Sequence, residues 1–351
     1  MSVLFIDFET RGVLDLREVG LHNYARHPQT DVWCMAHAQE ENDPSVWLPA
    51  QKLSSYFVQY IERGGLVIAH NAPFELEIWN EIMVPRYGWP VLKPEQVICT
   101  MAAAYAMALP GALEDVALAL GLNVLKDTEG RSLMLRMARP RSIERGKPIW
   151  WDDPDKLARL YAYCQQDVRV EREVYKRLMP LSDKERKLWQ IDYAINQRGV
   201  KVDMPAVKAG IKMAEFLKAD YDRQITEATN GEVQTCNALI PLKQWLKAHG
   251  CAADSLTKQD VVDLLANPAT DAEARTVLTL RQDAGKASTA KLASMLAVAG
   301  EDDRLRNLFQ YHGAATGRWA GRKVQPHNLR RDTLSERQIN AVFDLMGKND
   351  V

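Results

Sequence analysis

The sequence predicts an α/β protein whose sheet lies in the first half of the chain and whose second half is mainly helical. Up to about residue 150, short apolar runs alternate with segments of helical spacing, a pattern typical of a mixed sheet flanked by helices. From Asp152 onward the strand signals nearly disappear and amphipathic helical spacing replaces them. A length of 351 residues allows two domains with cores of their own.

The strands expected in the first part are short apolar runs at 3–8, 32–38, 46–48 and 66–69. Helical spacing between and after these runs predicts helices at 53–62, 74–83 and 100–108. The clearest helical pattern is the one from Asp153 to Leu178, where apolar side chains recur at helical intervals. This order of elements suggests a mixed sheet covered by helices.

The later part of the chain is expected to be helical up to about residue 300. Predicted helices lie at 182–196, 205–225, after 255–257, and at 271–299 with a break near Gly285. The remaining predicted elements are a strand at 305–311, a Gly- and Arg-rich segment at 313–331, and a helix at 333–346. These changes of character place the main boundary near residue 180.

Composition and charge exclude several classes of protein. The chain is 46% hydrophobic and 26% charged, as in folded globular proteins, and its formal net charge of -1 gives no overall attraction to nucleic acid. Its five cysteines are widely separated and lack the paired spacing of zinc sites. The sequence lacks a secretion signal and any apolar run near the roughly 18 to 20 residues of a membrane span. We therefore expect a cytoplasmic protein without a membrane partner.

Asp7 and Glu9 lie two residues apart at the end of an apolar strand, so the strand period of two places both on one face. Two like charges at a buried strand end are costly unless a cation compensates them. Hard carboxylate ligands suit Mg²⁺ or Mn²⁺. Taken alone, the pair also fits a strand that simply ends in solvent.

Two further segments carry candidate residues. Tyr163 and Asp167 are four apart on the long predicted helix and share a face, where a phenol beside a carboxylate could position an acidic, metal-activated water. Alone, they also fit a packed aromatic and a surface charge. Glu75 stands in 70–75, a segment that follows a short strand and opens a helix. Alone, Glu75 also fits a first-turn acid favoured by the helix dipole.

Together these segments resemble the three exonuclease motifs of the DEDD superfamily, in the variety whose third motif is Y-x-x-x-D. The matching sequences are FIDFET at 5–10, HNAPFE at 70–75 and YCQQD at 163–167. The resemblance covers about residues 1–180 and implies a ribonuclease H-like fold there. It implies a 3′-to-5′ DNA exonuclease that releases nucleoside 5′-monophosphates from single-stranded DNA or a primer-template 3′ end.

The resemblance also implies roles for single residues. Asp7 would bridge two divalent cations, Mg²⁺ or Mn²⁺, with Glu9 and Asp167 on the first and Glu75 supporting the second. Tyr163 and Glu9 would orient the attacking water. The family usually has Asp where Glu75 stands, and the extra methylene shifts the carboxylate by roughly 1 Å.

Three residues beside these motifs are implied contacts to the terminal nucleotides. These are Thr10, Asn71 and Phe74, of which Phe74 could stack on a base and the other two could bind sugar or phosphate. Phe74 also fits an ordinary core position, because it lies in the first turn of a helix.

The downstream half resembles the segment that follows the proofreading domain in family A DNA polymerases, particularly phage-type ones. The matching sequences are INQRGVKVD at 195–203, KASTAKL at 286–292, GAATGRWAG at 313–321 and VQPHNL at 324–329. The implied domains are an exonuclease domain at 1–180, a helical thumb-like region at 181–303 and the start of the polymerase palm at 304–351. The implied DNA contacts are Lys286, Ser288, Lys291, Thr316, Arg318, Gln325 and Asn328.

Five cations lie close together near the end of this segment, a grouping that suits phosphate contacts but also fits a solvated loop. They are Arg318, Arg322, Lys323, Arg330 and Arg331. The catalytic carboxylate motifs of a family A polymerase would follow this point and none is found, so polymerase activity is not expected from this chain alone.

Several alternatives stay open at this stage. The chain fits either a polymerase cut short after its first palm motif or one half of a split polymerase completed by a separate polypeptide. In both cases we expect the last 50 or so residues to be mobile or self-associating without a partner. The alternative functions are a nonenzymatic DNA-binding or assembly subunit and an RNA exonuclease similar to ribonuclease D.

Overall fold

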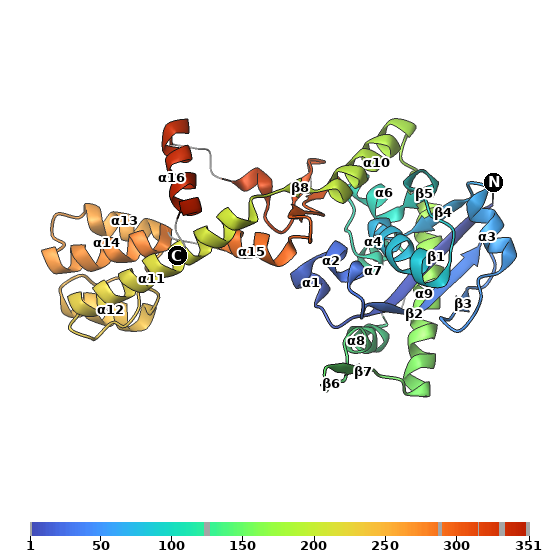
Figure 1. Ribbon diagram of the computed structural model, residues 1–351, viewed down its shortest axis with the longest axis horizontal. Coiled ribbons are helices and arrows are strands. Elements are labelled where there is room, and N and C mark those ends of the chain that lie inside the picture. Colours follow the sequence, from blue (N-terminus) through green and yellow to red (C-terminus); the bar gives the residue numbers. More distant parts are fainter. Residues whose placement is uncertain (1, 123–126, 287–289, 315, 330–333, 349–351) are drawn as a thin grey trace. The chain divides into compact units, whose positions relative to one another are not determined.

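The computed structural model describes residues 2–122, 127–286, 290–314, 316–329 and 334–348 (Figure 1). The chain forms two compact units. The first comprises Met1–Lys201 and Ala297–Arg330, and the second comprises Val202–Leu296 and Arg331–Val351. Residues 181–201 and 297–330 therefore pack with the first unit, while the predicted division into exonuclease, thumb and palm domains stays a prediction.

A five-stranded mixed sheet forms the centre of the first unit. In spatial order its strands are β3 (Ser45–Trp47), β2 (Asp31–Gln39), β1 (Val3–Arg11), β4 (Leu66–Ala69) and β5 (Val97–Cys99). The pairs β1–β2 and β2–β3 are antiparallel, whereas β1–β4 and β4–β5 are parallel. The four predicted strands and the mixed sheet are confirmed, and β5 is an additional strand of three residues.

Five helices of the first unit correspond to predicted ones. They are α3 (Ser55–Glu62), α4 (Ala72–Ile78), α6 (Thr100–Ala106), α9 (Pro154–Arg177) and α10 (Asp183–Arg198). After α4 the chain continues into a π-helix and α5, at Trp79–Met83 and Val84–Tyr87. The elements that the sequence did not predict include α1 (Leu16–Val19), α2 (Leu21–Arg26), α7 (Leu113–Ala119), α8 (Thr128–Met137), β6 (Ser142–Glu144) and β7 (Lys147–Ile149).

The two faces of β1 serve different purposes. Ile6 and Phe8 belong to the largest hydrophobic cluster, which also takes in α4 and the π-helix. Phe5 points the other way and packs in a cluster with α9. Because side chains alternate along a strand, Asp7 and Glu9 continue the row of Phe5 toward α9. The fold thus directs both carboxylates at the helix that carries the third motif.

The predicted strand at 305–311 is wrong as a single element. The structure has two short strands, β9 (Arg304–Leu305) paired with β8 (Val200–Lys201), and β10 (Phe309–Gln310) paired with β11 (Ala320–Gly321). Asn307 separates β9 from β10 because its backbone is left-handed, with φ of 55°, and its N–H donates to the carbonyl of Asn196. The pairing therefore changes partner halfway along the predicted strand.

The second unit is helical, as the sequence predicts. Its helices are α11 (Met204–Ala228), α12 (Leu239–Ala248), α13 (Lys258–Ala266), α14 (Ala272–Lys286), α15 (Ala290–Val298, which ends just beyond the unit) and α16 (Glu336–Lys348). Ile225, Trp245 and Leu278 lie in its hydrophobic core. Among the described residues, the helices are too short or too polar to cross a membrane.

Candidate active site

Asp7, Glu9 and Cys164 form the tightest group of potential ligands among the described residues, with one side-chain atom of each lying within 4.8 Å of the others. The Cys164 thiol lies 3.3 Å from both the backbone oxygen and Oδ2 of Asp7. On the neighbouring strand β2, the residues opposite Asp7 and Glu9 are the small Ala36 and Cys34. Small neighbours leave space above the sheet for the two carboxylates.

Glu75 on α4 and Asp167 on α9 are not members of this 4.8 Å group, but they lie near enough for their charges to interact with Asp7 and Glu9. The nearby charge of Asp7 contributes to a raised pKa at Glu75 and at Asp167, although burial is the larger cause at both. At Glu9, burial and then the charge of Asp7 raise the pKa well above its usual value, and the charges of Asp167 and Glu75 make smaller contributions. We call these four residues, Asp7, Glu9, Glu75 and Asp167, the acidic cluster.

Burial dominates the protonation of the acidic cluster. It raises the pKa of Asp7 to about 7, and the hydrogen bond from Cys164 opposes the shift. It raises the pKa of Asp167 to about 8, with a further rise from the charge of Asp7. Desolvation and mutual repulsion are the two terms that penalise ionised carboxylates in such a place. The cluster therefore favours a compensating positive charge.

Glu75 gives a second indication of a cation. It lies in the first turn of α4 after Asn71, which has a left-handed backbone, and only 4% of its surface is exposed. Its Oε2 is buried and has no hydrogen-bond partner within the described part of the chain. A buried carboxylate oxygen without a partner is costly, and a cation or its bound water would satisfy it.

These observations fit divalent cations held by the acidic cluster. Carboxylate oxygens are the ligands that Mg²⁺ and Mn²⁺ prefer. Cys164 is a different kind of neighbour, because burial raises the pKa of its thiol well above the usual value and keeps it protonated. We therefore assign Cys164 as a hydrogen-bond donor that orients Asp7 rather than as a ligand.

Tyr163 lies one turn before Asp167 on α9 and is only 7% exposed. Burial and the charges of Asp167 and Glu9 raise the pKa of its hydroxyl far above the usual value, so the phenol stays neutral and can donate a hydrogen bond. Gly130 of α8 packs directly against the ring, and a Cβ at that position would lie 2.5 Å from Cδ2 of Tyr163. Helix α8 thus restricts the position of the ring.

Glu171 is a fifth buried acid that sequence reasoning missed. It follows Asp167 by one turn on α9, is 1% exposed, and has a pKa raised well above its usual value, first by burial and then by Asp7. The Thr100 hydroxyl donates to Glu171 at 3.5 Å and lies 2.9 Å from Nδ1 of His70. Burial lowers the pKa of His70 to about 4, so its ring is neutral.

A sequence signal for Glu171 did exist. Cys164 and Val168 define the buried stripe of α9, and Glu171 follows at the next helical position on that stripe. An acid on a buried stripe, four residues after a candidate ligand, indicates a polar site within the core.

Comparison with known proteins agrees with part of this interpretation. The sequence is 32% identical over 347 residues to a protein described as a DNA polymerase from Bacillus phage SP02, a match that covers 96% of this chain and 52% of the relative. The chain is homologous to a phage DNA polymerase. It spans about half the length of that relative. A scan against protein-family models finds no match.

The fold of this polymerase homologue also has a counterpart among solved structures. It resembles the structure described as the POL domain of Pol1 from M. smegmatis in complex with DNA primer-template and dNTP. The TM-score is 0.54 at 13% sequence identity, and the match covers 97% of this chain and 54% of that one. At this identity the likeness concerns the fold alone.

The predicted nucleotide contacts of the first half lie in three different environments. The Thr10 hydroxyl is nearly buried and lies 3.0 Å from the hydroxyl of Tyr24. Phe74 is half-buried and packs against the main core, which was its alternative interpretation. Asn71 is exposed at the start of α4. Of the three, Asn71 is the one most accessible to a substrate.

Asn71 also borders a cleft of the first unit with a volume of about 490 Å³. Residues from the far end of the chain line the same cleft, among them Phe309, Tyr311 and Arg322. The structure thus brings the second exonuclease-like motif next to the segment that resembles the start of a polymerase palm.

The predicted contacts of the second half lie on two parts of the chain. Thr316, Arg318, Gln325 and Asn328 are exposed in the first unit, and the Asn328 amide donates to Oε1 of Gln325 at 3.1 Å. Lys291 lies on α15 in the second unit. Ser288, Arg330, Arg331 and the side chain of Lys286 fall outside the described residues.

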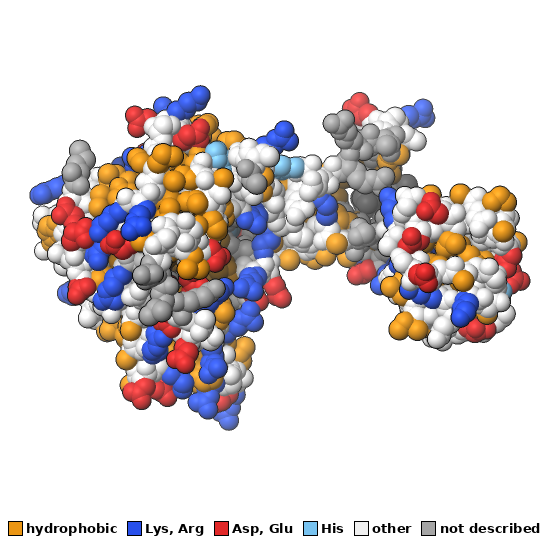
Figure 2. Space-filling model, turned by 180° about the vertical axis from the view of Figure 1, so that it is seen from behind, with side chains coloured by type: hydrophobic (Ala, Val, Ile, Leu, Met, Phe, Trp, Pro, Cys, Tyr) orange, Lys and Arg blue, Asp and Glu red, His pale blue; other side chains and the backbone are white. Residues whose placement is uncertain are grey.

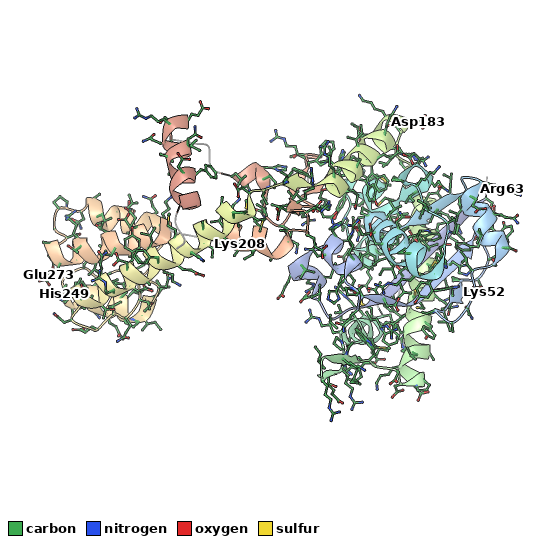
Figure 3. The ribbon with its side chains drawn as sticks, viewed as in Figure 1. Lys52, Arg63, Asp183, Lys208, His249 and Glu273 are labelled. Atoms are coloured by element: carbon green, nitrogen blue, oxygen red, sulfur yellow. The ribbon has the colours of Figure 1, made fainter. Side chains whose placement is uncertain are left out.

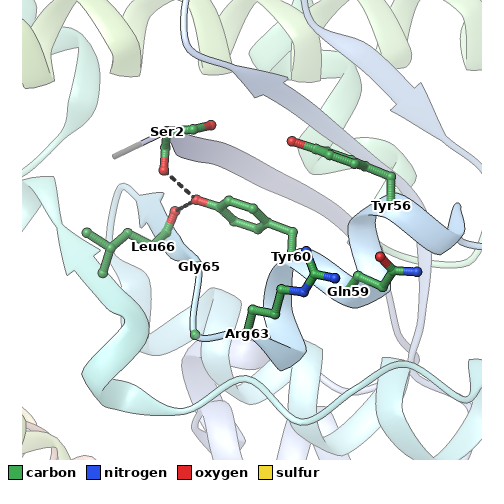
Figure 4. A pocket seen from close by; sticks show the side chains of 8 residues that line it. Ser2, Tyr56, Gln59, Tyr60, Arg63, Gly65 and Leu66 are labelled. Atoms are coloured by element: carbon green, nitrogen blue, oxygen red, sulfur yellow. Dashed lines mark hydrogen bonds between the residues drawn. The ribbon is translucent and has the colours of Figure 1, made fainter.

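A separate surface cavity beside α3 and β4 is not a candidate site (Figure 4). The Tyr60 hydroxyl crosses it and lies 2.8 Å from the backbone oxygens of Ser2 and Leu66. The other lining side chains include Tyr56 and Arg63. Its lining has no acid or histidine that could hold a metal or activate a hydroxyl, so the acidic cluster remains the place where chemistry is expected.

Proposed function

We propose that the first unit is a divalent-metal-dependent 3′-to-5′ DNA exonuclease of the proofreading type. The observation that carries the proposal is the convergence of the acidic cluster from three separate segments, on β1, α4 and α9. The strand order β3-β2-β1-β4-β5, with β2 antiparallel to β1, supports a ribonuclease H-like fold. The homology to a phage DNA polymerase supports DNA as the substrate.

The chemistry follows from the residues of the site. Bound divalent cations would acidify a water and neutralise charge on the scissile phosphate. The acidic cluster would hold them, with Asp7 oriented by the thiol of Cys164. The neutral Tyr163 hydroxyl would fix the water in line with phosphorus. Water oxygen bonds to phosphorus, the bond to the 3′ oxygen breaks, and that oxygen takes up a proton, leaving a nucleoside 5′-monophosphate.

We further propose that the rest of the chain corresponds to the thumb and the first palm elements of a family A DNA polymerase. The homology covers 96% of the chain, and the segments at 313–321 and 324–329 support this assignment. The exposed Thr316, Arg318 and Asn328 would contact primer-template backbone. Nucleotide addition would need further catalytic residues, from a longer chain or a separate polypeptide.

The test is degradation of a single-stranded DNA oligonucleotide carrying an internal label, with Mg²⁺ or Mn²⁺. We expect stepwise shortening from the 3′ end, release of nucleoside 5′-monophosphates and complete inhibition by EDTA. Asp7→Asn should lower the rate by more than the roughly 100-fold that is typical of residues outside a metal's ligand shell. Asp183→Asn, a change of an exposed acid at the start of α10, is the matched control (Figure 3).

A matched RNA strand separates the two enzymatic alternatives. Preferential degradation of RNA would favour a ribonuclease D-like activity. Binding of DNA without any metal-dependent shortening would overturn the proposal and favour the nonenzymatic DNA-binding subunit.

A further inference from the structure

Residues 128–149 form an arm with a charge unlike that of the rest of the chain. This basic arm consists of α8, the β6–β7 hairpin and their connection, and it holds six Arg or Lys against two Glu, whereas the whole chain has a net charge of -1. All six cations are exposed, namely Arg131, Arg136, Arg139, Arg141, Arg145 and Lys147. A local excess of exposed positive charge attracts polyanions.

The arm projects from one end of the first unit. Figure 1 places α8, β6 and β7 together beside the amino-terminal end of α9, and Figure 2 shows this lobe in the lower left of the picture, with Lys and Arg side chains at the lower right of its tip and Asp and Glu side chains at the lower left. The hairpin contributes almost nothing to a hydrophobic core, since Ile143 is 61% exposed and Ile149 is 40% exposed. A short, exposed two-stranded hairpin has little stability of its own. A role in binding accounts for it better than a role in folding.

The tip of the hairpin is a tight turn, and the cations at this turn are exposed to solvent. Glu144 pairs with Lys147, and Arg145 and Gly146 form the two-residue turn with φ of 50° and 78°. Two positive φ values are the geometry of the tight type I′ turn. Within the described residues, Arg145 and Lys147 have no carboxylate within ion-pair distance. Their charge is therefore available to an outside partner.

Three tryptophans lie beside the arm, of which Trp33 is buried while Trp150 and Trp151 are partly exposed and could stack on bases. The guanidinium of Arg11 lies 4.3 Å from the ring centre of Trp33 and 5.3 Å from that of Trp150. Three cations lie near the ring centre of Trp151: the guanidinium of Arg136 at 5.9 Å, that of Arg141 at 5.6 Å and the ammonium of Lys156 at 5.4 Å. Aromatic rings interleaved with cations are the usual means of holding single-stranded nucleic acid, because bases stack on the rings and phosphates pair with the cations.

Both ends of α8 contact residues that lie next to the acidic cluster in the sequence or on the same helix. Arg11 follows Glu9 by two residues on β1, and the N–H of Gly12 donates to the carbonyl of Ala138 at 3.0 Å. At the other end of α8, Gly130 lies against the ring of Tyr163. The arm therefore extends directly from the residues that would carry out hydrolysis.

From this arrangement we propose that the basic arm is a strand guide, which binds single-stranded DNA a few nucleotides from the 3′ end that enters the acidic cluster. The proposal rests on the proposed exonuclease function for its substrate. Arg145 and Lys147 contact backbone phosphates, and the exposed Ile143 beside them contacts bases. Binding at the arm is independent of sequence, because both contacts are made to groups that every nucleotide carries.

The test measures binding without hydrolysis. A fluorescent single-stranded DNA oligonucleotide is titrated in EDTA at several salt concentrations with wild-type protein, with Arg145→Gln/Lys147→Gln and with Lys52→Gln/Arg63→Gln. The last variant removes two exposed cations beside α3, at another edge of the unit (Figure 3). Each phosphate contact to a single strand contributes about 0.7 to the slope of log K against log salt. The arm variant should therefore lose about 1.4 from that slope, and the control variant should lose nothing.

A kinetic measurement separates this proposal from the proposed function. With Mn²⁺, the arm variant should show a raised KM on the oligonucleotide and an unchanged rate on a dinucleotide, which is too short to reach the arm. An unchanged salt slope, or an equal loss in both variants, would overturn the strand guide. If the arm variant shows the reduced salt slope but the wild-type protein does not hydrolyse DNA, the strand guide would be supported and the proposed exonuclease function would be wrong.

Discussion

Raising the pH of the metal-free protein should destabilise it, because the acidic cluster is buried. Burial raises the pKa of Asp7 from 3.8 to about 7 and that of Asp167 from 3.8 to about 8. A carboxyl with a pKa raised by folding contributes stability that is complete below its unfolded pKa and is lost as pH rises through its folded pKa. The shift at Asp7 alone corresponds to about 4 kcal/mol. The two groups repel each other, so their effects overlap, and we expect a total loss between pH 4 and pH 9 of roughly 6 kcal/mol, the size of the larger shift, at Asp167.

Urea unfolding followed by tryptophan fluorescence is the assay, because eight of the nine tryptophans lie in the first unit. In EDTA the free energy of unfolding should fall between pH 5 and pH 8. At pH 8, Mg²⁺ or Mn²⁺ at about 100 times its dissociation constant should restore about 2.7 kcal/mol, and much less at pH 5. Asp7→Asn should flatten the pH dependence and be more stable than wild type at pH 8 without metal. A metal-free wild type whose stability stays level or rises over this range would refute the reasoning.

Three substitutions test the surroundings of the cluster. Glu75→Asp withdraws the carboxylate by roughly 1 Å and should lower the rate of nucleotide release about 100-fold, with a nearly unchanged KM for the oligonucleotide. A rate equal to or faster than that of the wild type would show that this position does not need Glu. Gly130→Ala pushes a Cβ into the ring of Tyr163. It should lower the rate of nucleotide release and reduce the free energy of urea unfolding by about 1 to 3 kcal/mol. Normal activity would mean that the position of the ring is unimportant. Thr100→Val leaves Nδ1 of the partly buried His70 without its 2.9 Å partner and should cost about 1 to 3 kcal/mol in the same assay. An unchanged midpoint would contradict the assigned hydrogen bond.

The central strands and long helices could be predicted from the sequence because their patterns are strong. The apolar run at 66–69 and the helical stripe of 153–178 were found almost to the residue, as β4 and α9. The elements that were missed are short or exposed. β5 has three residues, and the β6–β7 hairpin lacks an apolar face, so neither has the periodicity on which the prediction depends. Residues 297–330 pack with the first unit through long-range tertiary contacts, which local sequence patterns do not predict.

The candidate site, too, could be predicted only in part from the sequence. Strand and helix periods predict that Asp7 and Glu9 share a face and that Tyr163 and Asp167 share another. Nothing in those spacings brings the two faces together, and that expectation came from resemblance to known exonuclease motifs. The orienting thiol of Cys164 depends on a contact between α9 and β1 that becomes visible when the fold is built, whereas Glu171 has a signal in the buried stripe of α9.

Titration with Mn²⁺ followed by electron paramagnetic resonance tests the central claim most directly, because it counts the cations that the acidic cluster holds. The wild-type protein should bind two Mn²⁺ per chain, close enough for their spins to interact, and Asp7→Asn should lose at least one and the interaction with it. Equal binding by wild type and Asp7→Asn would contradict a metal site at the acidic cluster, and with it the proposed hydrolysis of DNA.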